Sequence, residues 1–299
     1  MHIEHPGRHF RRCLLSIACL LMAAATGGDT DPPPTRIAVI GASASAGFGV
    51  IEEIGTPGDA VRFKAVSLGD LIITAGRDQE IVVLDLASGS FFTRPERFGT
   101  ASMKRVESWN PDLVVAIDFL FWFVYGSSGR TTETRADEDP RLTRLETGLA
   151  LLDELKVPLI IGEIPDMSAA IGGMLSRAQV PSSATMKAAN TRIHEWAAAR
   201  PGTAVVPLFE LTTMLRSGEA FTIGDVRWDP DAEGLALILP DKLHPSLEGL
   251  VAMLQSAMVE AGRNPDIRER LPKLVLDRET LVDRVREVTP TPAVTSEAP

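Results

Sequence analysis

A carboxylate and an imidazole lie three residues apart near the end of the chain, in the segment Asp241-Lys242-Leu243-His244-Pro245. If residues 241–244 form one helical turn, both side chains lie on the same face. A carboxylate that orients an imidazole and stabilises its protonated form is the base half of a nucleophilic triad. The alternative is structural, with Pro245 as the first residue of a helix and Asp241 as an anion near its N-terminus. A nucleophile elsewhere in the chain would favour the first interpretation.

The first 25 residues have the layout of a secretory signal peptide. Three arginines precede an apolar run, Cys13–Ala25, and this run ends in the small residues Ala23-Ala24-Ala25. The run is too short for a membrane-spanning helix, although a short N-terminal anchor is the alternative. We therefore expect an exported protein, periplasmic or extracellular, whose mature part begins with a Pro-rich leader over residues 26–35.

Removal of residues 1–25 excludes cysteine chemistry and leaves few histidines for catalysis. Both cysteines leave with them, so the mature chain holds no thiol for a disulfide, a metal site or a nucleophile. Of the five histidines only His194 and His244 remain. His194 lies in the middle of an expected helix and is interpreted as a surface or core residue. We expect no metal and no other cofactor.

The charge balance argues against two classes of partner. The chain carries 30 Lys and Arg against 40 Asp and Glu, a formal net charge of −10. Such a surface repels nucleic acid and anionic membranes. We expect neither as a partner.

Short apolar strands alternate with helical segments through most of the chain. The strands are expected at 36–41, 80–86, 112–118, 157–162 and 203–208. The helices are expected at 61–75, 98–109, 140–156, 182–199, 209–217 and 246–261, with a loop-like insertion at 217–239. This alternation predicts one α/β domain over residues 36–262, with a five-stranded parallel sheet covered by helices on both faces. A charged extension at 263–288, with a helix at 277–287, and a disordered tail at 289–299 are expected to follow.

Residues that follow the strands are candidates for a site, because ligands bind beyond the carboxyl ends of an open parallel sheet. Ser43 follows the first strand in Gly41-Ala42-Ser43-Ala44-Ser45, a turn that exposes its hydroxyl and can aim backbone N–H groups at one point. Ser45 ranks second, because it would face the opposite way. A plain turn of small residues is the alternative. A dinucleotide loop is disfavoured, because the spacing of the glycines differs from Gly-x-Gly-x-x-Gly.

These segments, in this order, resemble the SGNH/GDSL hydrolases. The family's Gly-Asp-Ser block appears as Gly41-Ala42-Ser43, its second block as Leu86–Ser90 with Gly89, and its Asp-x-x-His-Pro block as Asp241–Pro245. The resemblance covers residues 36–262. It implies a three-layer α/β/α flavodoxin-like fold and a two-step acyl transfer, in which Ser43 is the nucleophile, His244 the base and Asp241 its orienting acid. It also implies an oxyanion hole that includes the Ser43 and Gly89 N–H groups.

The third block departs from the family pattern. Gly-x-Asn-Asp is replaced by Ala116-Ile117-Asp118-Phe119, so Asp118 stands in the oxyanion hole where an asparagine would donate. An ionised aspartate only accepts hydrogen bonds and would repel an oxyanion. We therefore expect from the sequence that Asp118→Asn raises esterase activity.

The aromatic run Phe119–Tyr125 follows the third strand. It is interpreted either as part of a substrate pocket, through Phe119 and Trp122, or as packed core. In the insertion at 217–239, Trp228 is expected to cover the cleft.

The leading hypothesis is an exported serine esterase that acts on an acylated glycan, a lipid or a small metabolite. One alternative is a secreted binding or accessory protein of the same fold with weak or no catalysis. The other is an acyltransferase that uses the same serine. The sequence does not define an oligomeric state.

Overall fold

A computed structural model of the chain describes residues 35–54, 62–126 and 140–287. The expected signal peptide, almost all of the Pro-rich leader, and the expected tail at 289–299 lie outside these residues. The described residues all belong to one compact unit.

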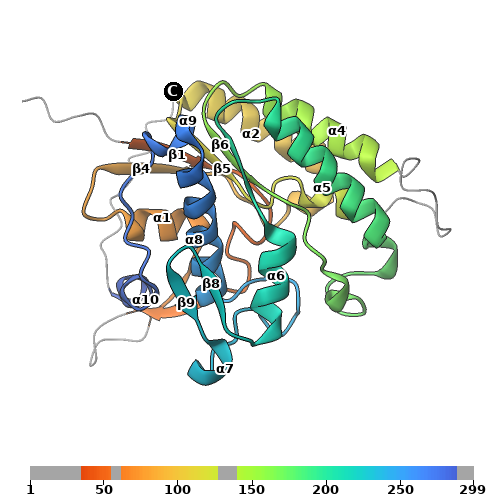
Figure 1. Cartoon of the computed structure of the whole chain (residues 1–299). Helices are drawn as coiled ribbons and strands as arrows, with labels where there is room; N and C mark the ends of the chain where they lie inside the picture. Colours follow the sequence, from red (N-terminus) through yellow and green to blue (C-terminus); the bar gives the residue numbers. More distant parts are fainter. Residues whose placement is uncertain (1–34, 55–61, 127–139, 288–299) are drawn as a thin grey trace, which may run out of the picture. The chain divides into compact units, whose positions relative to one another are not determined.

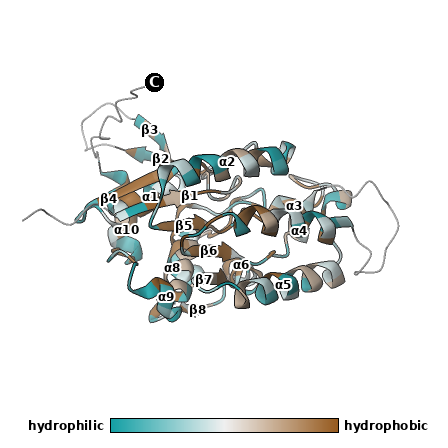
Figure 2. Ribbon diagram, turned by 90° about the horizontal axis from the view of Figure 1, so that it is seen from above, coloured by the Kyte–Doolittle hydropathy of each residue, from teal (hydrophilic) through white to brown (hydrophobic). Residues whose placement is uncertain are grey.

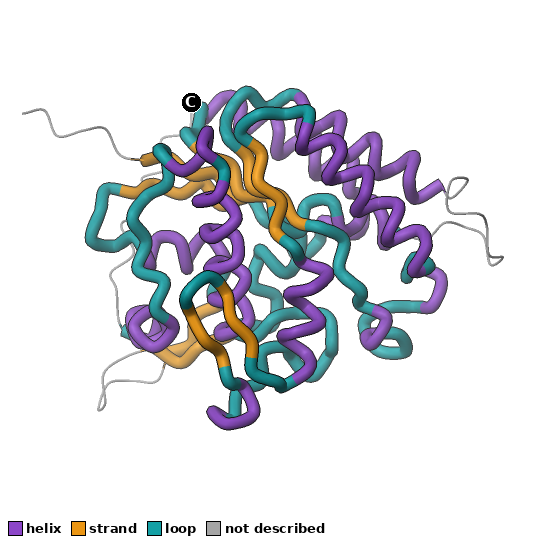
Figure 3. Tube along the Cα trace, viewed as in Figure 1, coloured by secondary structure: helices purple, strands orange, loops and turns teal. Residues whose placement is uncertain are grey.

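A five-stranded parallel sheet forms the centre of this unit (Figure 3). Its strands are β1 (Thr35–Val39), β4 (Ile81–Asp85), β5 (Leu113–Ala116), β6 (Leu159–Gly162) and β7 (Thr203–Val206), in the spatial order β4-β1-β5-β6-β7. The predicted fold class is therefore confirmed. Because β4 is the second strand of this sheet along the chain, the order corresponds to the flavodoxin-like 2-1-3-4-5 arrangement, whose switch point lies between β1 and β5.

The two faces of the sheet are covered by different helices (Figure 1). Ile37 and Val39 point into one apolar cluster, and Ala38 and Ile40 point into the other, as the two-residue period of a strand requires. The first cluster holds α1 (Leu68–Ala75), α6 (Leu208–Ser217), α8 (Leu247–Arg263) and α10 (Arg278–Arg286). The second holds α2 (Pro95–Trp109), α4 (Pro140–Asp153) and α5 (Ser183–Ala198). Figure 2 shows the sheet strands as hydrophobic segments between these helices.

Helix α8 is buried along most of its length, and its N-cap Ser246 directly follows the Asp241–Pro245 segment. Ser246 is its N-cap and accepts a hydrogen bond from the Gly249 N–H at 3.1 Å. Its run Leu247–Ala257 is buried apart from Glu248. The C-terminal segment, with α9 (Pro265–Arg268) and α10, packs on the same cluster. Residues 241–245 are thereby anchored to the core.

The segment before α1 differs from the prediction. The expected helix at 61–75 begins only at Leu68, because Ser67 and Asp70 form a capping box there. Before it, β2 (Ile51–Ile54) and β3 (Arg62–Ala65) pair antiparallel as a hairpin. The hairpin connects the loop that carries Ser43 to α1.

The insertion at 217–239 also has more structure than expected. It contains the strands β8 (Phe221–Ile223) and β9 (Val226–Trp228) and the short helix α7 (Pro230–Glu233). The expectation for Trp228 is wrong. Its ring is buried, stacks on Phe221 and donates to Gln255 of α8 at 2.9 Å, so it anchors the insertion to the core instead of covering a cleft.

Within the ranges that the structure describes, no helix combines the length and the apolar character needed to cross a membrane.

Candidate active site

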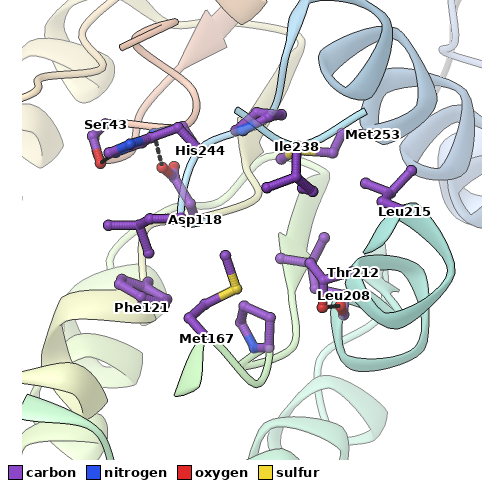
Figure 4. A pocket seen from close by; sticks show the side chains of 14 residues that line it. Ser43, Asp118, Phe121, Met167, Leu208, Thr212, Leu215, Ile238, His244 and Met253 are labelled. Atoms are coloured by element: carbon purple, nitrogen blue, oxygen red, sulfur yellow. Dashed lines mark hydrogen bonds between the residues drawn. The ribbon is translucent and has the colours of Figure 1, made fainter. Parts of the chain in front are cut away.

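Ser43, His244 and Asp241 form a continuous line of hydrogen bonds at the carboxyl edge of the sheet. The Ser43 Oγ lies 2.9 Å from the His244 Nε2, and the His244 Nδ1 lies 2.7 Å from the Asp241 Oδ2. Figure 4 shows Ser43 and His244 side by side at one end of a pocket. A hydroxyl on one imidazole nitrogen and a carboxylate on the other is the arrangement that activates a serine as a nucleophile.

The Asp241–His244 segment is a turn and not a turn of helix. Lys242 has a positive φ of 60°, which reverses the chain between the two side chains. The Asp241 Oδ1 accepts from the Leu243 and His244 N–H groups, at 2.9 and 3.0 Å. The structural alternative for this segment is wrong, because the helix begins after Ser246 and the turn places the carboxylate on the imidazole.

These contacts change the pKa of the Asp241 carboxyl group. Burial alone would raise the pKa of Asp241, but the hydrogen bonds from the His244 N–H, the His244 ring and the Leu243 N–H together lower that pKa below its usual value. The His244 side chain is only 3% exposed. The ring of Phe48 lies on it, with 4.5 Å between the ring centroids. Asp241 therefore stays ionised while it orients a shielded imidazole.

Asp118 holds the loop that carries Ser43. Its Oδ1 accepts from the Ala42 N–H at 2.9 Å and from the Ser45 hydroxyl at 2.6 Å. Its Oδ2 accepts from the N–H groups of Ala44 and Ser45, at 3.0 and 3.1 Å. Because Ser43 lies between these donors, one buried carboxylate fixes the backbone on both sides of the serine.

This contact explains the glycine before the loop. A Cβ on Gly41 would lie 2.1 Å from the Asp118 Oδ1, so a larger residue would push the carboxylate away from its donors. The hydrogen bonds between Asp118 and the Ser43 loop therefore require a glycine at position 41.

Two sequence-based expectations change as a result. Ser45, the second choice as nucleophile, is fully buried and its hydroxyl is bound to Asp118. Asp118 was expected in the oxyanion hole, where its charge would oppose the reaction. The structure instead directs both of its oxygens to four donors of the Ser43 loop. Asp118 thus takes a positioning role for which an acceptor is the required chemistry.

Two backbone N–H groups remain available at the site. Gly89 lies in the loop after β4, and this loop is tied to the Ser43 loop by the Ser88 N–H, which donates to the Gly41 carbonyl at 3.1 Å. A Cβ on Gly89 would lie 3.7 Å from the Phe48 ring that covers His244. Among the described residues, no acceptor lies within hydrogen-bond distance of the Ser43 or Gly89 N–H.

A pocket opens beside Ser43 and His244, with mostly apolar walls (Figure 4). Its lining comes from the Ser43 loop, the start of α3 (Phe121–Tyr125), the loop after β6, α6, the segment around His244, and α8. The lining residues are Ser43, Ala44, Asp118, Phe121, Pro165, Met167, Leu208, Thr212, Leu215, Ile238, Leu243, His244, Pro245 and Met253.

The aromatic residues expected in the pocket are not the ones found there. Phe119 is fully buried and packs between Phe91 and Phe123, at 5.4 and 5.6 Å between ring centroids. Trp122 packs against Phe92 and faces a separate surface depression. Phe121 lines the pocket instead, because the short helix α3 turns neighbouring aromatic side chains to different sides.

Most of the pocket wall was not predicted from the sequence. One signal was present, since Leu208, Thr212 and Leu215 have the spacing of a single helical face on α6. Met167, Ile238 and Met253 come from three segments that only the tertiary fold brings together. No local pattern in the sequence identifies them.

His194, the other mature histidine, pairs with a different carboxylate. Its Nε2 lies 2.7 Å from the Glu163 Oε1, and its side chain is 53% exposed. It lies at the surface, one of the two settings expected from the sequence, and among the described residues it makes no hydrogen bond to the Ser43 site. In the described part of the chain, no group of three or more His, Cys, Asp and Glu side chains is arranged to hold a metal ion.

Comparisons by sequence and by structure give different results. No protein-family model matches the chain, and no curated protein matches it. Among solved structures, TesA is similar with a TM-score of 0.44 and 17% identity over 79% of this chain and 100% of that chain. A catalytic mutant of Axe2, an acetylxylan esterase from Geobacillus stearothermophilus, has a TM-score of 0.45 and 15% identity over 76% of this chain and 92% of that chain.

A third similar structure is BT4096, a gut microbial diltiazem-metabolizing enzyme, with a TM-score of 0.42 and 12% identity over 76% of this chain and 46% of that chain. With TM-scores below 0.5, these likenesses carry no argument about chemistry.

Proposed function

We propose that this protein is a serine hydrolase that cleaves esters through an acyl-enzyme on Ser43, and that it is related to the SGNH/GDSL hydrolases. One observation carries the proposal: the Ser43 Oγ, the His244 ring and the Asp241 carboxylate are joined by hydrogen bonds of 2.9 and 2.7 Å. Three side chains from two segments about 200 residues apart take up the geometry that nucleophilic catalysis needs.

The reaction has two steps. The Ser43 Oγ attacks the ester carbonyl while the His244 Nε2 takes its proton, and Asp241 stabilises the imidazolium. The Ser43 and Gly89 N–H groups hold the oxyanion. The Nε2 then gives its proton to the departing alcohol, which leaves an acyl ester on Ser43. Water, deprotonated by the same nitrogen, attacks this ester, and the acid leaves as the serine regains its proton.

Two features support an active enzyme over a non-catalytic accessory protein. The loop around Ser43 is held by four hydrogen bonds to Asp118, and such a fully paired network fixes the position of the serine, as catalysis requires. The Ser43 N–H and the Gly89 N–H, which lies in the neighbouring loop, also make no hydrogen bond within the described residues. Export from the cell, which rests on residues 1–25, is part of the proposal.

An activity-based fluorophosphonate probe tests the proposal. The wild-type protein should be labelled, and Ser43→Ala should abolish the labelling. Ser108→Ala is the matched control, because Ser108 is an exposed serine on α2 whose loss should leave labelling unchanged. A folded wild-type protein that is not labelled would favour the accessory-protein alternative.

A further inference from the structure

We infer that the pocket beside Ser43 is an acyl site that selects short, purely hydrocarbon acyl groups and rejects polar ones. The inference rests on the proposed function, since it names the acyl group that Ser43 would carry. The inference also limits the candidate substrates. A sugar or another hydroxylated group could form the alcohol part of the ester but not the acyl part.

The pocket leads away from the nucleophile. In Figure 4, Ser43 and His244 lie at one end, and Leu215 and Met253 lie at the other. An acyl group bound to the Ser43 Oγ therefore points its chain along the apolar walls. The alcohol part is left on the outer side, where the half-exposed ring of Phe48 covers His244.

Polar groups along the far walls are already satisfied within the protein. The Thr212 hydroxyl donates to the Leu208 carbonyl at 2.7 Å, so it presents its methyl side to the pocket. The Pro165 carbonyl accepts from the Tyr125 hydroxyl at 2.7 Å. A polar acyl group entering here would lose its hydrogen bonds to water and find no replacement on these walls, which opposes its binding.

Asp118 strengthens this selection. Its carboxylate lines the pocket, but both oxygens are bound to donors of the Ser43 loop. An acyl group with a carboxylate would bring a second negative charge into the same apolar pocket, where repulsion between like charges is strong.

Tyr125 fixes one wall of the pocket. Its hydroxyl donates to the Pro165 carbonyl and accepts from the Met167 N–H, both at 2.7 Å, so it ties the loop after β6 to α3. Pro165 and Met167 both line the pocket. The wall is therefore held in place and does not simply yield to a longer chain.

The cavity is small. Its volume is about 50 Å³, whereas an engineered apolar cavity that binds benzene has about 150 Å³. In proportion to the six carbons of benzene, such a space takes about two to three carbons beyond the acyl carbonyl, and a longer chain has to displace Leu215 or Met253.

A series of 4-nitrophenyl esters measures this selection. We expect kcat/KM to be highest for the propionate or butyrate and at least about tenfold lower for the octanoate, since one methylene in an apolar pocket is worth about ten- to 200-fold. The 3-methoxypropionate, which matches the pentanoate in length but carries an ether oxygen, should be hydrolysed more slowly than the pentanoate.

Leu215→Ala extends the cavity at its far end and should move the optimum towards the hexanoate or octanoate. Leu211→Ala is the matched control, because Leu211 is buried on the same helix but does not line the pocket. It should lower thermal stability by a similar amount and leave the optimum where it is.

The outcomes are distinguishable. A protein that is labelled by fluorophosphonate but shows a flat chain-length profile, or the same optimum after Leu215→Ala, overturns the acyl-site assignment alone. Faster hydrolysis of the methoxypropionate than of the pentanoate also overturns it. A protein that is neither labelled nor active on any ester overturns the proposed function and the assignment together.

Discussion

The molecule contains two histidine–carboxylate pairs with the same contact distance and different surroundings. His244 and Asp241 are 2.7 Å apart, and so are His194 and Glu163. The His244 side chain is 3% exposed, whereas that of His194 is 53% exposed. Each pair alone could orient an imidazole.

The difference lies in what the second ring nitrogen meets. In the first pair the carboxylate takes Nδ1, and the Nε2 reaches the Ser43 hydroxyl. In the second pair the carboxylate takes Nε2, and no described residue is within hydrogen-bond distance of the Nδ1 of His194. A histidine–carboxylate pair becomes a candidate base only when the rest of the fold supplies a nucleophile and keeps water from the ring.

The largest difference in kcat is expected between the variants that lose the imidazole of His244 and of His194. His244→Ala should lower kcat by about four to six orders of magnitude, since the serine loses its base. His194→Ala should leave kcat unchanged, because this exposed ring contacts no part of the Ser43 site. Steady-state hydrolysis of 4-nitrophenyl butyrate by the two variants measures the contrast. A large loss of activity in His194→Ala would show that the exposed pair has a catalytic role.

Substitution of Asp241 should lower kcat and substitution of Glu163 should not, and the loss should be smaller than that for His244→Ala. Asp241→Asn should lower kcat by about 10⁴-fold, because an amide favours the wrong tautomer of His244. Glu163→Gln keeps an acceptor for the Phe209 N–H, which now binds the Glu163 Oε2 at 3.2 Å, and should leave kcat unchanged. Equal losses in both variants would contradict the assignment of Asp241 as the orienting acid.

Asp118 allows a finer test of what makes the Ser43 site different. Asp118→Asn replaces one accepting oxygen by an NH₂ group and leaves a buried N–H of the Ser43 loop without an acceptor, at a cost of about 1–3 kcal/mol. We expect kcat to fall by about 10- to 100-fold with KM nearly unchanged, since the serine is misplaced while the pocket stays intact.

This outcome is opposite to the sequence-based expectation. Ser45→Ala, which removes one donor and keeps the carboxylate, should have a smaller effect than Asp118→Asn. A rise in kcat for Asp118→Asn would restore the expectation that the charge of Asp118 opposes the oxyanion.

The smallest expected effect is on the pH dependence of stability. The pKa of Asp241 is lowered on folding from an unfolded value near 3.8, so its ionised form stabilises the fold above that pH. This contribution disappears as the pH falls through the lowered value. The midpoint of thermal unfolding should therefore differ between wild type and Asp241→Asn at neutral pH and converge at the acidic end. A difference of the same size at both ends would show that charge is not involved.

The parts of the site that follow from local rules could be predicted from the sequence. Asp241 and His244 are three residues apart in one turn, and Ser43 and Gly89 follow two strands with clear apolar runs. The five strands were found for the same reason, because short β-branched runs closed by turn residues are a local signal.

The parts of the site that depend on contacts between distant residues could not be predicted from the sequence. Asp118 binds donors 73 to 76 residues away, so no local pattern assigns it an accepting role. The hairpin β2–β3 was missed because apolar residues at 61, 65 and 68 happen to suit a helix. The capping box of Ser67 and Asp70 was the signal that could have placed the helix start correctly.

The hydrogen bond between Ser43 and His244 joins residues that are 201 positions apart. The nucleophile and its base therefore do not meet until the sheet has formed and α8 has docked, which in a chain made from its N-terminus happens after nearly all of it has been synthesised. A nascent or unfolded chain carries an ordinary serine and an ordinary histidine. If Ser43 is the nucleophile that we propose, hydrolysis of esters requires a completely folded chain, and an unfolded chain would be inactive wherever it is.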